Sequence, residues 1–151
     1  MSATPSTADP FTLELQHIRG LIEANQLPQA AQALNAAQKK APKDARLPLL
    51  GMRMAERVGN LENATQAARR ALALAPDWQV AQIELALLLA RQKQGDEAMR
   101  LAMQALANAP RDAQVMVGAI NVALFSERHD QTLAWAEEGV RRFPDNAGIR
   151  L

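Results

Sequence analysis

The side chains that could support catalysis or bind a metal are few and widely separated in this sequence. Its two histidines, His17 and His129, lie more than a hundred residues apart, and it has no cysteine. The missing cysteines exclude disulfides, thiolate catalysis and cysteine-ligated zinc. The adjacent carboxylates Glu137 and Glu138 point apart on a helix, and no serine or glycine motif matches a hydrolase or a phosphate-binding loop. The sequence therefore predicts no catalytic residue, no metal site and no cofactor.

Charge and hydropathy narrow the range of partners. Seventeen Lys and Arg residues face sixteen Asp and Glu residues, which gives a formal net charge of +1. A nearly neutral chain has no general attraction for nucleic acid or anionic membranes. The longest apolar run, residues 85–90, is far shorter than the roughly 20 residues of a membrane span, and the N-terminus lacks the features of a signal peptide. We therefore expect no nucleic-acid or membrane partner and a cytoplasmic location.

The elements that must position any functional residue follow a repeat of 34 residues. Four prolines recur at this spacing: Pro42, Pro76, Pro110 and Pro144. Two columns of small residues share the period: Ala30, Ala64, Ala98 and Thr132; Ala37, Ala71, Ala105 and Gly139. This regularity predicts four structural copies, at 11–44, 45–78, 79–112 and 113–146.

Each copy is typical of two helices joined by a short break. Ala and Leu make up about a third of the chain, and both favour helix. We expect the breaks near 25–28, 59–60, 94–96 and 127–130, and we expect Asp44, Asp112 and Asn146 to cap the helices that follow. The small columns predict close contact between helices, above all at Ala64 and Ala98. One pair cannot bury its apolar faces alone, so the pairs should stack into an all-α solenoid.

Two segments carry a family resemblance. RVGNLENATQAARRALALAPD (57–77) and RQKQGDEAMRLAMQALANAPRD (91–112) resemble the tetratricopeptide repeat, and the resemblance extends over 11–146. It implies a right-handed superhelical solenoid of antiparallel helix pairs. The family's aromatic residue in the first helix is absent, and its column holds Glu14, Pro48, Gln82 and Met116. Its small residue in the middle of that helix is retained only as Ala86, with Ile18, Met52 and Ile120 in the other copies.

The resemblance also implies a concave groove, lined by the first helix of each copy, that binds a protein or peptide. The matching columns give the following candidate groove residues: Leu15, Arg19, Leu49, Arg53, Arg57, Ile83, Leu87, Arg91, Val117, Asn121 and Phe125. An apolar strip flanked by arginines suits a segment with apolar anchors and acidic groups. The alternative interpretation is that the aliphatic residues are ordinary core and the arginines ordinary solvated side chains.

One family subtype is excluded at the sequence level. Some members that assist chaperones hold a terminal carboxylate with a clamp of Lys, Asn, Asn, Lys and Arg. The matching positions in copies one to three are Leu15, Arg19, Leu50, Val80 and Glu84. In copies two to four they are Leu49, Arg53, Glu84, Gln114 and Gly118. Neither set could form the clamp, so we expect no chaperone-tail ligand.

The remaining expectations concern His17 and the two ends of the chain. His17 shares a column with Leu85 and Ala119, which predicts a packed histidine, whereas His129 falls at a turn and should be exposed. Residues 1–10 are expected to be disordered, and residues 147–151 to begin a truncated further helix. The fourth copy would then leave Leu133, Val140 and Phe143 uncovered. Such a face suits either a fragment of a longer protein or self-association through the C-terminal repeat.

The sequence as a whole predicts a non-catalytic protein- or peptide-binding scaffold. One alternative is the N-terminal regulatory or partner-recruiting region of a larger enzyme, such as a transferase. Another is a small secretion-type chaperone. A reading frame that runs well past Leu151 would favour the first alternative, and a co-purifying secreted client would favour the second.

Overall fold

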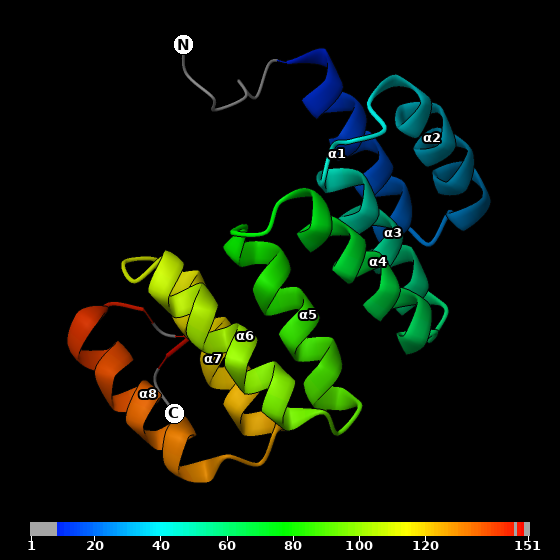
Figure 1. Cartoon of the computed structure of the whole chain (residues 1–151). Helices are drawn as coiled ribbons and strands as arrows, with labels where there is room; N and C mark the ends of the chain where they lie inside the picture. Colours follow the sequence, from blue (N-terminus) through cyan, green and yellow to red (C-terminus); the bar gives the residue numbers. More distant parts are fainter. Residues whose placement is uncertain (1–8, 147, 150–151) are drawn as a thin grey trace. The chain divides into compact units, whose positions relative to one another are not determined.

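The computed structural model describes residues 9–146 and 148–149, and within them it contains eight α-helices and no strand (Figure 1). The helices are α1 (Pro10–Glu23), α2 (Leu27–Lys40), α3 (Arg46–Arg57), α4 (Leu61–Leu74), α5 (Gln79–Arg91), α6 (Gly95–Asn108), α7 (Ala113–Phe125) and α8 (His129–Arg142). The second helix of each pair begins 34 residues after the one before it. The predicted all-α repeat of helix pairs is therefore confirmed.

The helix starts are stabilised by acidic and amide side chains. Asp112 Oδ1 accepts hydrogen bonds from the backbone N–H groups of Gln114 (2.9 Å) and Val115 (3.4 Å), and Asp44 Oδ1 accepts one from Arg46 (3.0 Å). Asn146 Oδ1 accepts one from the N–H of Gly148 at 2.9 Å. These bonds satisfy donors that have no partner within a helix.

The first helix begins earlier than the sequence suggests. Asp9 accepts a hydrogen bond from the N–H of Phe11 at 3.1 Å, and Pro10 occupies the first helical turn, where its missing N–H is harmless. Asp9 and Pro10 therefore belong to the folded part of the chain, although both fell near the end of the segment predicted to be disordered. Residues 1–8 lie outside the described residues.

All four turns within the helix pairs share one geometry. The left-handed residue is Asn25, Gly59, Lys93 or Glu127, with φ between 58° and 75°, again at intervals of 34 residues. The next N–H bonds back to a carbonyl five residues earlier, as in Gln94 to Leu89 (2.9 Å) and Arg128 to Ala123 (2.9 Å). The third break thus centres on Lys93. Gly95, predicted to lie in the break, is the first residue of α6.

The chain forms two compact units, Met1–Leu74 and Ala75–Leu151. In the first unit α3 packs against both helices of the preceding pair, α1 and α2, as well as against α4. In the second unit α7 packs in the same way against α5, α6 and α8 (Figure 1). Each of these two first helices is thus the element that joins two pairs, because its apolar side chains cover both helices before it.

The small residues lie at the helix contacts, as predicted. Ala64 and Ala98 have no exposed surface, and neither do Ala30, Ala37, Ala71 and Ala105 in the same columns. Gly139 continues the second column in α8. A Cβ atom placed on it would lie 2.7 Å from Cγ2 of Ile149, which is itself fully buried. The missing side chain therefore makes room for the residues after α8.

Two expectations about single residues have different outcomes. His17 is exposed, so the prediction of a packed histidine is wrong. The equivalent Ala119 is buried because neighbouring helices cover α7, whereas no described helix precedes α1. His129 is exposed at the start of α8, as predicted.

The surface at the end of the second unit retains apolar side chains. On α8, Leu133 is 58% exposed and Val140 is 42% exposed, while Phe143 is half-buried. Gly148 and Ile149 form a turn, and residues 147, 150 and 151 lie outside the described residues. The predicted start of a further helix at 147–151 therefore stays a prediction.

Candidate functional site

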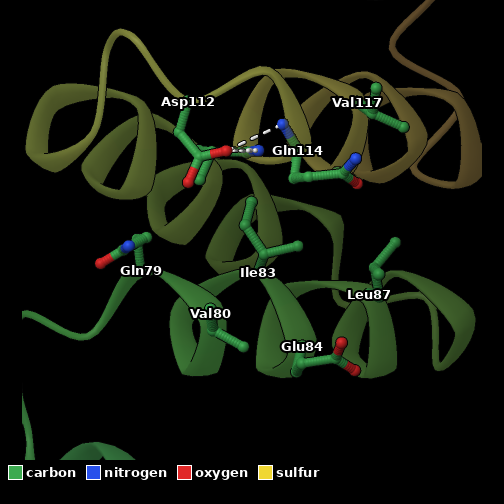
Figure 2. Close-up of a pocket in the computed structure, with 10 residues that line it drawn as sticks. Gln79, Val80, Ile83, Glu84, Leu87, Asp112, Gln114 and Val117 are labelled. Atoms are coloured by element: carbon green, nitrogen blue, oxygen red, sulfur yellow. Dashed lines mark hydrogen bonds between the residues drawn. The ribbon is translucent and has the colours of Figure 1, made fainter. Parts of the chain in front are cut away.

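A pocket lies between the first helices of the second unit, α5 and α7 (Figure 2). Its volume is about 240 Å³. The residues that line it come from one face of α5 and from the start and first half of α7: Gln79, Val80, Ile83, Glu84, Leu87, Asp112, Gln114, Val115, Val117 and Gly118.

The floor of this pocket is apolar and depends on a glycine. Ile83 points from α5 toward α7 (Figure 2), and a Cβ atom placed on Gly118 would lie 2.5 Å from its Cγ2 atom. A real Cβ cannot lie so close, so only glycine permits this approach of α7 to Ile83. Leu87 and Val117 are half-buried beside Ile83, and their surfaces remain accessible from solvent.

The polar groups around the floor are carboxylates and amides. Asp112 stands at the start of α7, where its carboxylate accepts the two backbone hydrogen bonds marked in Figure 2. Glu84 lies on α5, one turn before Leu87, and the side chains of Gln79 and Gln114 complete the rim. Among the residues that line the pocket there is no Lys, Arg or His.

The structure brings together only part of the predicted groove set in this unit. Ile83, Leu87 and Val117 line the pocket. Asn121 and Phe125 are exposed farther along α7, and Arg91 is exposed at the end of α5, but none of the three lines it.

The predicted groove residues of the first unit are arranged differently. Leu15 and Leu49 are each only 7% exposed, and Leu15 belongs to the apolar core with Ile18 and Ile22. The core interpretation therefore describes Leu15 better than the groove interpretation does.

Two arginines of the first unit contact the same residue of α1. Arg19 is exposed and pairs with Glu23 at 3.1 Å, while an Nη atom of Arg57 donates to the backbone carbonyl of Glu23 at 3.1 Å. These contacts hold both arginines close to the end of α1. The third predicted arginine, Arg53, is half-buried on α3.

Several pocket residues were not among the predicted groove residues. Val80, Glu84, Gln114 and Gly118 all line the pocket. They also occupy four of the columns in which a carboxylate clamp was sought and not found. Those columns contained the signal: they mark where first helices face each other, whatever residue types stand there.

The comparisons with known proteins identify the fold. No protein-family model and no curated protein sequence matches the chain. Among solved structures, TTC0263, a thermophilic TPR protein of Thermus thermophilus, superposes with a TM-score of 0.79 at 15% identity, covering 93% of this chain and 78% of that one. The chain has the tetratricopeptide repeat fold. The predicted resemblance is therefore confirmed, and α1, α3, α5 and α7 are the first helices of its repeats.

Two further structures with this tetratricopeptide repeat fold belong to larger chains. PilF of Pseudomonas aeruginosa matches with a TM-score of 0.78 and 18% identity, over 92% of this chain and 64% of that one. A mutant O-GlcNAc transferase of Thermobaculum terrenum matches with a TM-score of 0.75 and 20% identity, over 93% of this chain and 27% of that one. At these identities the likeness shows the fold alone.

Two other kinds of site were considered on the tetratricopeptide repeat scaffold. Across residues 9–146 and 148–149, no group of three or more His, Asp or Glu residues gathers in a way that could hold a metal ion. In the same residues no helix is long and apolar enough to cross a bilayer.

Proposed function

We propose that this chain is a non-catalytic scaffold that binds a protein or peptide segment in the groove between α5 and α7. The observation that carries the proposal is the accessible apolar surface of Ile83, Leu87 and Val117 between two first helices. Apolar side chains left open between packed helices suit the anchor residues of another chain. The tetratricopeptide repeat fold supports the same conclusion, because repeat solenoids use such surfaces for binding.

The size of the pocket favours a peptide segment over a small metabolite. Small-molecule sites usually occupy about 300–1,000 Å³. At about 240 Å³, this pocket would hold one or two side chains of a larger ligand. The rest of such a ligand would lie along the exposed surfaces of α5 and α7.

The experiment uses a random peptide library displayed on phage and selected against the folded chain. Val117→Glu places a carboxylate on the pocket wall, and Met103→Glu makes the same change at an exposed position of α6. We expect selected peptides to bind Val117→Glu about tenfold more weakly or worse, and Met103→Glu as tightly as the unmodified chain. Both variants should keep their helical circular dichroism. If no peptide is selected, or if Val117→Glu binds every peptide normally, the proposal is wrong.

In the first unit we propose that Arg19, Arg53 and Arg57 contact acidic side chains of a partner. Arginine anchors often dominate interfaces while contributing little to folding when exposed. Arg53→Ala with Arg57→Ala should therefore weaken the binding of acidic selected peptides, while Arg69→Ala with Arg70→Ala on α4 should not. The reverse result would place the contact on the second helices.

A second candidate function is the partner-recruiting part of a larger enzyme. The likeness to the O-GlcNAc transferase favours it, because this chain covers only 27% of that protein. Determining the reading frame around the gene would test it, since a catalytic domain should then be encoded in the same frame.

A further inference from the structure

We propose that the groove between α5 and α7 selects segments that present an aliphatic side chain next to a lysine or arginine. This inference rests on the proposed function and adds the chemistry of the partner to it. Two properties of the pocket carry the inference: an apolar floor, and a rim whose charged groups all have one sign.

The floor determines the anchor. Ile83 lies at the bottom, with Val80, Leu87 and Val117 around it, so the surface that a ligand must cover is aliphatic. Burying a matching Leu, Ile, Val or Met side chain removes apolar surface from water on both sides of the contact. A polar anchor would lose its hydration there, and the floor offers it no hydrogen-bonding side chain in return.

The rim determines the charge. Its two ionisable side chains, Glu84 and Asp112, are both carboxylates. Asp112 accepts hydrogen bonds from the first N–H groups of α7, so the positive helix end offsets part of its charge. Glu84 lies in the middle of α5, away from either helix end. It therefore contributes most of the negative potential at the pocket, which attracts a cation and repels an acidic segment.

The spacing on α5 fixes how close anchor and cation must be. Glu84 follows Ile83 directly, and Val80 and Leu87 lie one turn before and after it on the same side of the helix (Figure 2). Side chains three or four residues apart on a helix lie about 5–6 Å apart at Cβ. A ligand whose aliphatic group covers Ile83 would thus place Glu84 within reach of a basic side chain at a neighbouring position.

The test uses the same random peptide library and considers only peptides that lose binding to Val117→Glu. Among these groove-dependent peptides we expect Lys or Arg to be enriched beside an aliphatic residue. A synthetic peptide of this class should bind Glu84→Lys at least tenfold more weakly, and Glu84→Gln several-fold more weakly. The matched control is Glu137→Lys, which reverses an exposed charge on α8 and should leave the affinity unchanged.

The outcomes separate this inference from the proposed function. Groove-dependent peptides that are acidic or uncharged, or that bind Glu84→Lys normally, would overturn the charge selectivity and leave peptide binding intact. An equal loss of affinity in Glu137→Lys would also overturn it, because the effect would then be a general one of net charge. If no peptide depends on Val117, the proposed function fails, and this inference fails with it.

Discussion

Asn108 at the end of α6 donates a hydrogen bond through Nδ2 to Oε1 of Gln82 near the start of α5, at 3.2 Å. Gln82 is 3% exposed, and its Nε2 donates in turn to the carbonyl of Pro76 at 3.2 Å. Two repeats earlier, Lys40 and Glu14 occupy the same two columns and form an ion pair of 2.8 Å. Alternate repeats thus place a polar link between their two helices where the family has an aromatic residue.

This relationship predicts unequal costs for the two links. Gln82→Leu removes both hydrogen bonds at a buried site and should lower the free energy of unfolding by about 1–3 kcal/mol. Glu14→Leu breaks a more exposed ion pair and should cost about 0–1 kcal/mol. Urea denaturation measures both. A double-mutant cycle with Asn108→Ala should show coupling for Gln82, and purely additive effects would contradict a specific bond.

Replacing Gly118 should strain the contact between α5 and α7. Gly118→Ala gains about 1 kcal/mol of helix propensity but forces its Cβ against the stiff branch of Ile83, and overpacking costs about 1–3 kcal/mol. We expect a net loss of stability in thermal unfolding. Ile83→Leu removes the methyl group on Cβ that is in the way, so the double variant should recover most of the loss. A Gly118→Ala variant more stable than the original chain would contradict this packing.

Enlarging a residue in the small columns should be costly only where helices meet. Ala98 is fully buried on α6, so Ala98→Leu should cost about 1–3 kcal/mol. Ala107 is exposed near the end of the same helix, and Ala107→Leu should change stability by less than about 0.5 kcal/mol. Equal effects in urea denaturation would show that the contact face of α6 has been misassigned.

Acidification should weaken the first unit through Asp44. The hydrogen bonds from the Arg46 guanidinium, at 2.7 and 3.0 Å, hold the pKa of the Asp44 carboxyl below its ordinary value. A lowered folded-state pKa gives stability that is present above the unfolded pKa, near 4, and is lost as the pH falls through the folded value. Asp44→Asn keeps the helix cap but removes this charge.

The unfolding free energies of the Asp44→Asn variant and the original chain provide the measurement. They should differ by about 1 kcal/mol at neutral pH, and the difference should narrow as the pH falls below about 4. With Arg46→Gln already present, Asp44→Asn should have little further effect. A difference that stays constant with pH would exclude the ion pair as its source.

The apolar end of the second unit predicts concentration-dependent self-association. Leu133 and Val140 lie two helical turns apart on α8, on one side of the helix, and both are exposed. Leu133→Glu with Val140→Glu should abolish any dimer seen in sedimentation velocity, whereas Val58→Glu, at another exposed aliphatic position, should not. A monomer at every concentration of the unmodified chain would rule out this mode of association.

Local sequence was enough to predict the repeat and its helices. The four prolines and the small columns fix where helices end and where two of them touch, because both depend on a few neighbouring residues. The turn conformation was less visible. Only Gly59 among the four left-handed residues is a glycine, and Asn25, Lys93 and Glu127 adopt the same conformation because the helices on both sides require it.

The division between core and groove was decided by tertiary structure. Leu15, Leu49 and Ile83 share a column and are equally buried, so neither spacing nor burial distinguishes them. Ile83 forms the floor of a pocket because Gly118 stands opposite it on α7 and leaves accessible surface around it. A repeat column fixes the direction in which a side chain points. What stands across from it depends on the neighbouring helix, and only the packed structure shows that.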